Sequence, residues 1–176
     1  MTQLYTLAFP KLSQHDQNWI DQVRQRCDPD FKKVRPHFTL LFGCADVSID
    51  VYAQHVADIA KAIAPFKFHA RRVSPGIDHF GTMGYAFLVP DEGHSSVLEL
   101  HDRLYSGPLA PFLNLNLSYI PHITLGKCQG LQHAKILCDE LNREAISISG
   151  EIDTITVVEE NNDSVREQEQ FSLHGE

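Results

Sequence analysis

The most informative residues of this chain are two histidine–threonine pairs in nearly identical surroundings. The sequence reads Pro-His-Phe-Thr-Leu-Leu at 36–41 and Pro-His-Ile-Thr-Leu-Gly at 121–126, so His37 and His122 lie 85 positions apart (122 − 37). An unperturbed imidazole has a pKa of about 6.5 and changes charge near neutral pH. Two imidazoles that face one cleft are therefore suited to acid–base catalysis at neutral pH.

Each pair has the spacing at which a β-strand presents side chains to one face. His37 and Thr39 are two residues apart, as are His122 and Thr124. Side chains alternate between the faces of a strand, so each copy directs one imidazole and one hydroxyl to a single surface. The apolar residues that alternate with them point to the opposite face and can pack against helices.

Such a set of groups can open a cyclic phosphodiester with water. The reaction needs a base for the nucleophile and an acid for the leaving alkoxide, placed in line with the phosphorus. Two imidazoles on opposite sides of the phosphorus supply both, and two threonine hydroxyls can donate to the non-bridging oxygens. This arrangement requires no metal and no cofactor, and it predicts a bell-shaped pH profile with a maximum at about pH 6–8. A single histidine would more often be a hydrogen-bonded core residue, but duplication on matching strands favours a functional role.

The periodicity around the two motifs predicts that the same order of elements occurs twice. We expect, in chain order, a strand at 4–9, a helix from about Ser13 to Cys27, a strand at 36–43, a helix at about 52–63, a strand at 66–74, a turn at Pro75-Gly76, a strand at 83–89, a helix at about 97–104, a strand at about 119–127, a helix at 131–141, a strand region at 146–158, a polar turn at 159–163 and a last strand at 169–173.

This order predicts an α+β fold with an internal repeat at approximately 4–75 and 82–158. No linker separates the halves, so residues 1–176 are expected to form a single domain. We expect a duplicated, bilobal fold in which two antiparallel sheets with flanking helices surround a central cleft. Each lobe would supply one His-x-Thr strand to that cleft.

The two motifs resemble the mark of the two-histidine (2H) phosphoesterase superfamily, a repeated His-x-Thr followed by an apolar residue. The resemblance covers nearly the whole chain, since motif separation and flanking elements also fit. It implies two pseudo-symmetric lobes around a cleft and an activity similar to that of bacterial RNA 2′,3′-cyclic phosphodiesterases, also named 2′-5′ RNA ligases. It also implies that His37 and His122 are the catalytic pair and that Thr39 and Thr124 bind the phosphate.

Lys127 is a further candidate for substrate binding, because family members often carry a basic residue there. Strict alternation opposes this role: Gly126 shares the face of His122 and Thr124, so Lys127 points away unless a bulge intervenes. A basic cluster before the first motif has two open interpretations, a solvated face or a rim that attracts phosphate. The cluster comprises Arg24, Arg26, Lys32, Lys33 and Arg35.

The remaining candidates favour structural roles. Phe9, Phe80 and Tyr119 could stack on a nucleobase, but core packing is the more frequent role of such residues. His94 and His101 are seven residues apart, too far for a metal-binding pair one helical turn apart. We therefore expect no metal site.

Composition limits the partners. The 176 residues carry a net charge of −8, which argues against an extended nucleic-acid surface but allows a small cyclic nucleotide or an RNA terminus as ligand. The chain has no apolar run long enough to span a membrane and no N-terminal signal pattern. Its four cysteines show no metal-type spacing and are expected to be reduced thiols. We expect a cytoplasmic monomer.

The sequence thus predicts hydrolysis of an RNA or nucleotide 2′,3′-cyclic phosphate. ADP-ribose 1″,2″-cyclic phosphate or a 2′-5′ oligonucleotide could be cleaved by the same groups. A nucleotide-binding module without turnover is the alternative from another class. Intact histidines and threonines in both copies favour the enzyme.

Overall fold

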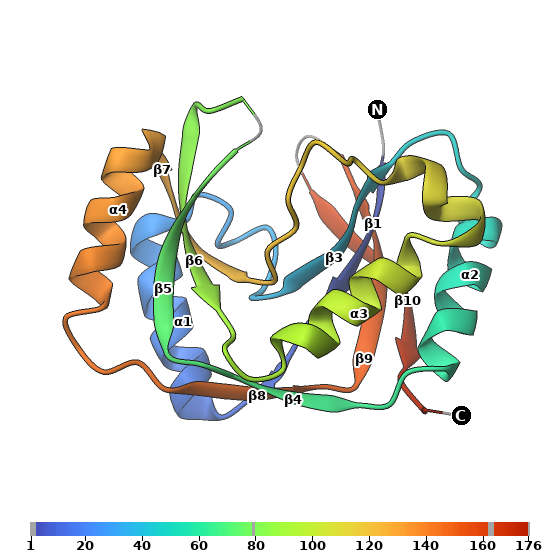
Figure 1. Ribbon diagram of the computed structural model, residues 1–176, viewed down its shortest axis with the longest axis horizontal. Helices are drawn as coiled ribbons and strands as arrows, with labels where there is room; N and C mark the ends of the chain where they lie inside the picture. The colour runs from blue at the N-terminus through green and yellow to red at the C-terminus, as the bar shows by residue number, and fades with distance from the viewer. Residues whose placement is uncertain (1–2, 79, 162–163, 176) are drawn as a thin grey trace.

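The computed structural model describes residues 3–78, 80–161 and 164–175, in which short strands alternate with helices (Figure 1). Ser13 caps the first helix, since its hydroxyl accepts a hydrogen bond from the Asp16 amide at 3.1 Å. The elements in chain order are β1 (Gln3–Ala8), β2 (Lys11–Leu12), α1 (Gln14–Cys27), β3 (Phe38–Cys44), α2 (Ile49–Lys61), β4 (Phe66–Ala70), β5 (Arg72–Ile77), β6 (Met83–Val89), α3 (His94–Leu104), the 3₁₀ helix η1 (Gly107–Phe112), β7 (Ile123–Gln129), α4 (Gly130–Leu141), β8 (Ile148–Ile152), β9 (Thr154–Glu160) and β10 (Val165–Ser172).

The strands form two sheets. A seven-stranded sheet has the order β10-β9-β1-β3-β7-β6-β5, and a three-stranded sheet has the order β2-β8-β4. Neighbouring strands are antiparallel in both sheets. The expected α+β class with two antiparallel sheets and flanking helices is confirmed.

The large sheet is almost divided in two at its centre. The strands that follow the two histidines, β3 and β7, pair through one residue pair, Phe38 with Ile123. These residues occupy the same position in the two motifs, and their antiparallel pairing places a local two-fold axis between them. Both side chains are buried, with 1% and 0% of their surface exposed, so the apolar face of the motifs enters the core as expected.

Each side of this junction is a lobe. Lobe one consists of β10-β9-β1-β3 covered by α2 and α3, and lobe two consists of β7-β6-β5 covered by α1 and α4. The lobes are therefore not the two halves of the chain. The first half sends α1 and β5 to lobe two, and the second half sends α3 and β9 to lobe one (Figure 1).

The small sheet explains two of the differences from the expected elements. The strand predicted at 66–74 is two strands, β4 and β5, and the region 146–158 is β8 and β9. In each case the chain leaves the small sheet and enters the large one within one residue, Arg71 or Asp153. Hydrophobic patterning does not reveal that consecutive strands belong to different sheets.

The turn predicted at Pro75-Gly76 is wrong, because both residues lie inside β5. This strand is at the edge of the sheet, where a proline is tolerated since one side of the strand has no hydrogen-bonding partner. Gly76 is needed for space, because a Cβ there would collide with the ring of Phe87 on β6.

The ends of several elements also differ from the prediction. The second motif strand begins at Ile123 and not at 119, and the last strand begins at Val165. Glu159 and Glu160 lie in β9 and not in the predicted turn. Residues 162–163 of that turn are outside the described residues.

Candidate active site

Four side chains of the two motifs are brought to one face by the junction of β3 and β7. In an antiparallel ladder around the Phe38–Ile123 pair, His37 lies opposite Thr124 and Thr39 lies opposite His122. All four are an odd number of residues from the central pair and share the face opposite to it. In a regular ladder, diagonal side chains are about 7–8 Å apart. The histidines occupy one diagonal of this square, and the threonines occupy the other.

The two imidazoles are held by the same hydrogen bond. Nδ1 of His37 lies 2.8 Å from the carbonyl oxygen of Arg35, and Nδ1 of His122 lies 2.6 Å from that of Ile120. A carbonyl only accepts, so Nδ1 carries the proton in both rings and donates. Nε2 is then the atom of each ring that can take or give a proton.

Burial favours the neutral form of both rings. It lowers the pKa of His37 to about 4, opposed by the hydrogen bond to Arg35 and assisted by the guanidinium of Arg24. It also lowers the pKa of His122 to about 4, and His37 acts in the same direction. His122 stacks on Phe87, with the ring centroids 3.6 Å apart. Without an anion, neither ring is predominantly charged at neutral pH.

A bulge in β7 changes the direction of Lys127. Gly126 pairs with Ala86 and Thr124 pairs with Phe87, so Leu125 is left without a partner on β6. The extra residue shifts the alternation, and Lys127 lines the same pocket as Thr124. The bulge that a phosphate-binding role of Lys127 requires is therefore present. The prediction from strict alternation, that Lys127 points away from Thr124, is wrong.

The same bulge occurs at the equivalent position of β3. Thr6 pairs with Leu41 and Leu7 pairs with Thr39, so Leu40 is left without a partner on β1. Here the residue equivalent to Lys127 is Phe42, which packs edge-on against Tyr119 with ring centroids 6.2 Å apart. Only one of the two equivalent positions therefore carries a cation.

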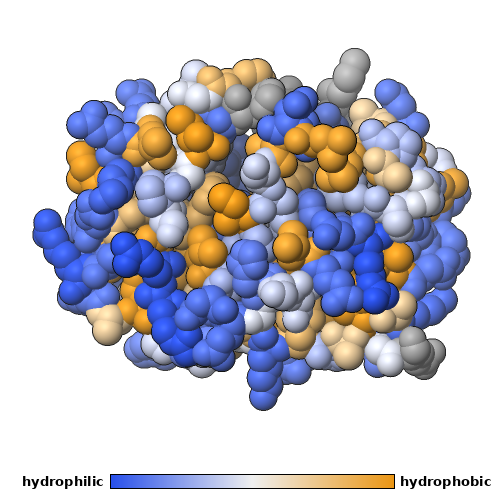
Figure 2. Space-filling model, viewed as in Figure 1, coloured by the Kyte–Doolittle hydropathy of each residue, from blue (hydrophilic) through white to orange (hydrophobic). Residues whose placement is uncertain are grey.

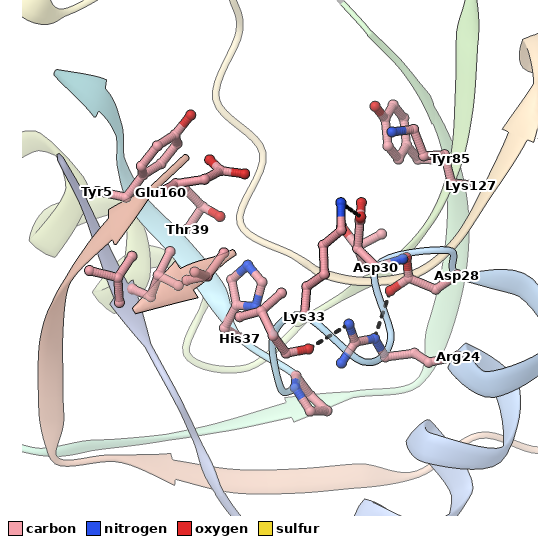
Figure 3. A pocket seen from close by; sticks show the side chains of 16 residues that line it. Tyr5, Arg24, Asp28, Asp30, Lys33, His37, Thr39, Tyr85, Lys127 and Glu160 are labelled. Carbon is pink, nitrogen blue, oxygen red and sulfur yellow. Dashed lines mark hydrogen bonds and ion pairs between the residues drawn. The ribbon is translucent and has the colours of Figure 1, made fainter. Parts of the chain in front are cut away.

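The pocket that contains these groups lies between the lobes, where the space-filling view shows a hollowed surface (Figure 2). His37, Thr39, Thr124 and Lys127 line it. His122 is half-buried and is not among the lining residues; it lies directly before β7, the strand that carries Thr124. Figure 3 shows Thr39 with Tyr5 and Glu160 on one side, Tyr85 and Lys127 on the other, and His37 and Lys33 between them.

A family model of the 2'-5' RNA ligase superfamily matches residues 12–164. The chain belongs to this superfamily. The resemblance seen in the two motifs is thereby confirmed at the level of the family.

Relatives of this chain carry phosphoesterase names. A Bacillus licheniformis protein named "Putative phosphoesterase" is 23% identical over 124 residues, which cover 69% of this chain and 70% of that protein. One from Oceanobacillus iheyensis is 25% identical over 149 residues, 82% of each chain. Among solved structures, TT0787 of Thermus thermophilus has a TM-score of 0.65 at 17% identity and 99% coverage of both chains. E. coli LigT complexed with 3'-AMP has a TM-score of 0.60 at 17% identity and 98% coverage of both.

The segment before His37 is fixed by contacts of Arg24. Arg24, on α1 of lobe two, is buried; its Nε donates to Asp28 at 2.8 Å and its Nη2 to the Val34 carbonyl at 2.9 Å (Figure 3). This buried ion pair ties the segment between α1 and β3 to the helix, and Arg35, whose carbonyl holds His37, belongs to that segment.

Beyond the single pair with β7, the backbone N–H and C=O groups on this edge of β3 form hydrogen bonds with side chains. The Tyr119 hydroxyl donates to the Thr39 carbonyl at 3.0 Å, and Nδ1 of His101 lies 2.7 Å from the Leu40 carbonyl. The Phe42 amide donates to the Tyr105 hydroxyl at 2.9 Å. Three ring side chains thus replace the neighbouring strand and allow β3 and β7 to separate around the pocket.

The other predicted candidates have mostly structural places. Of the basic cluster, Arg24 and Lys33 line the pocket, whereas Arg35 lies over the ring of Phe9 and pairs with Glu167 at 2.9 Å. Phe9 also contacts His37 edge-on, at 6.0 Å between centroids. Tyr119 stacks on His101. Phe80 is 82% exposed, so the expectation that it packs in the core is wrong.

The pocket residues that the sequence reasoning missed include Tyr5, Tyr85 and Glu160. The tyrosines lie 80 positions apart (85 − 5), close to the offset of the two motifs, so comparison of the repeats could have found them. Glu160 has no equivalent signal, because it reaches the pocket wall through the pairing of β9 with β1, which is distant in the sequence.

Three further features of the described residues concern metal binding, membrane insertion and the cysteines. Within 3–78, 80–161 and 164–175, no three His, Cys, Asp or Glu side chains lie together so that they could hold a metal ion. None of the helices there is both long and apolar enough to cross a membrane. The four cysteines, Cys27, Cys44, Cys128 and Cys138, are free thiols.

Proposed function

We propose that this protein hydrolyses a cyclic phosphodiester, with an RNA or nucleotide 2′,3′-cyclic phosphate as substrate, by paired histidine catalysis without a metal ion. The observation that carries the proposal is the pairing of Phe38 with Ile123, which sets the two motifs side by side, together with the pocket that His37, Thr39 and Thr124 line. Membership in the 2'-5' RNA ligase superfamily supports it.

The square suits an in-line displacement at phosphorus. One imidazole takes a proton from water through Nε2 as the water oxygen bonds to phosphorus. The bond from phosphorus to one ribose oxygen breaks, and the opposite imidazolium gives that oxygen its proton. The threonine hydroxyls and the Lys127 ammonium donate to the non-bridging oxygens, where negative charge must be stabilised. The diagonal arrangement allows either histidine to be the base.

A substrate panel tests the proposal. The purified protein is incubated with adenosine, guanosine, cytidine and uridine 2′,3′-cyclic phosphates, with ADP-ribose 1″,2″-cyclic phosphate and with a 2′-5′ dinucleotide, and the products are identified. We expect ring opening of a 2′,3′-cyclic phosphate at undiminished rate in EDTA. Loss of activity in EDTA that a divalent ion restores would contradict the metal-independent mechanism.

The panel also separates the alternatives. Turnover of the ADP-ribose or 2′-5′ substrate alone would assign the same groups to that substrate. Binding of nucleotides without turnover of any member would make the protein a binding module.

We also propose a cytoplasmic monomer that acts on small cyclic nucleotides or RNA ends, built from an internal repeat at about 4–75 and 82–158. The four free thiols and the net charge of −8 support this setting. Sedimentation with and without an RNA oligonucleotide would test the monomer and the absence of an extended RNA surface.

A further inference from the structure

The lobe-one wall of the pocket has an order that follows from strand register. Leu7 pairs with Thr39, Tyr5 pairs with Val158, and Gln3 pairs with Glu160. From Leu7 to Gln3 is four residues, about 13 Å along a strand. Glu160 therefore lies one side-chain row beyond Tyr5, at the end of the wall that is farthest from the threonine.

Three polar side chains, those of Gln3, Tyr5 and Glu160, lie together at the far end of this wall. The Tyr5 hydroxyl donates to Oε1 of Gln3 at 3.1 Å, and the Glu160 carboxylate is near enough to raise the pKa of Tyr5, which burial raises more strongly. Gly43 on β3 makes room for this group, since a Cβ there would collide with the side chains of both Gln3 and Tyr5. Among the described residues, no lysine or arginine forms an ion pair with Glu160.

The opposite wall, in lobe two, carries a positive charge beside the tyrosine that is equivalent to Tyr5. Tyr85 is the equivalent of Tyr5, and its strand partner is Lys127, whose ammonium lies 6.0 Å from the centre of the Tyr85 ring. One wall thus ends in an anion and the other carries a cation. A ligand with a phosphate at its centre is repelled by Glu160 if it extends a second phosphate toward lobe one.

On the basis of the proposed function, we propose that the lobe-one wall binds the nucleoside and that Glu160 selects guanine by accepting its N1–H and N2–H hydrogen bonds. With the phosphate at the His-x-Thr motifs, the base packs on Tyr5, whose neighbours in this wall are the buried Leu7 and Val158, and its edge meets the carboxylate.

Guanine fits a carboxylate better than the other bases do. A carboxylate only accepts hydrogen bonds, and guanine offers two adjacent donors that match its two oxygens. Adenine and cytosine offer one amine next to a ring acceptor, which faces the second oxygen unfavourably. Uracil has one donor between two carbonyls and fits least.

Calorimetric titration with product-like ligands tests the selection. Guanosine and uridine 2′- and 3′-monophosphates and inorganic phosphate are titrated into the wild-type protein, Glu160→Gln and Glu159→Gln. Glu159 is the matched control, because it accepts a hydrogen bond from Gln168 at 2.8 Å and does not line the pocket. We expect wild type to bind the guanosine phosphates at least about tenfold more tightly than the uridine phosphates, as one bidentate base contact provides.

The two variants then separate the contact from net charge. Glu160→Gln should remove most of the guanine preference and leave inorganic phosphate affinity unchanged, whereas Glu159→Gln should change neither. Equal binding of guanosine and uridine phosphates by wild type, or equal losses for both in Glu160→Gln, would overturn base selection. Failure of phosphate to bind wild type would instead contradict the proposed function. Thermal unfolding midpoints of both variants verify that they are folded.

Discussion

Each imidazole of the candidate site is fixed by its own chain, through a carbonyl two residues upstream. The residue between the ring and that carbonyl is a proline in both motifs, Pro36 and Pro121, and both are buried. Proline restricts the backbone on both of its sides, which limits the positions that the carbonyl can take relative to the ring. The hydrogen bond fixes the tautomer, and burial lowers the pKa of the ring and so favours its neutral form.

Replacement of either histidine should remove most of the activity. We expect His37→Ala and His122→Ala each to lower kcat/KM by roughly 10²–10⁴, the usual contribution of a general acid or base. The double variant should be little worse than either single one, because the pair acts as a unit. Thr39→Ala and Thr124→Ala should cost about 2–4 kcal/mol of transition-state stabilisation each. Steady-state kinetics on the best panel substrate provide the comparison; near wild-type rates in either histidine variant would refute the assignment.

The pH optimum should be more acidic than unperturbed histidines predict. The productive form needs one proton on the pair, and burial lowers the pKa of both rings, so this form declines as pH rises above those lowered values. We expect kcat/KM to peak below about pH 6.5. A bound phosphate anion favours the imidazolium, so kcat should peak at higher pH. Profiles from pH 4 to 9 measure both, and a kcat/KM maximum above pH 7.5 would contradict this account.

At the scale of elements, the strand that carries the first pair depends on rings from elsewhere in the chain. Tyr119 and Tyr105 come from the region between β6 and β7, yet they hydrogen-bond to backbone groups of β3. A strand edge without a partner would leave buried polar groups unsatisfied. Side chains therefore hold Thr39 in place while the strand itself remains apart from β7.

Removal of the Tyr119 hydroxyl should affect catalysis more than stability. We expect Tyr119→Phe to cost about 0.5–1.5 kcal/mol of folding free energy and to lower kcat several-fold, because its acceptor is the carbonyl of Thr39. Tyr105→Phe is the matched control, since it loses a similar bond three residues further along β3. Urea denaturation and kinetics of both variants are compared. Equal loss of kcat in the two would indicate a general effect on β3.

The sequence predicts the helices and strands better than it predicts how the strands pair and in which register. The two His-x-Thr pairs and their strands follow from a local period of two, which needs no knowledge of partners. The bulge at Leu125, which turns Lys127 into the pocket, depends on the register with β6 and leaves no local signal. Glu160 joins the site through pairing across most of the chain length, so local periodicity cannot place it.

At the scale of the whole molecule, neither half of the chain contains a complete lobe. In lobe two, β7 is covered by α4 of its own half and by α1 of the other half, and in lobe one the helix that covers β3 is α3 of the other half. Each half would therefore expose an apolar sheet face without its helix, and an uncovered face cannot offset the entropy of ordering the chain.

Separated halves should fold only together. A break in the connection between β5 and β6, at residues 78–82, yields two fragments that we expect to lack cooperative thermal unfolding when alone. An equimolar mixture should regain the circular dichroism spectrum and unfolding transition of the intact chain. Stable folding of one isolated fragment would contradict the interdependence of the lobes.

The axis between Phe38 and Ile123 has a chemical consequence. Two identical half-chains related by such an axis would surround the phosphorus with equal rings in equal fields, and no difference would decide which ring donates the proton. A single chain can break that equivalence away from the motifs, with Lys127 where the other half has Phe42 and with Glu160 beside one wall. Under the proposed mechanism, we expect the charges of the two walls to set the direction of proton transfer across the phosphorus, and exchanging these charges should reverse it.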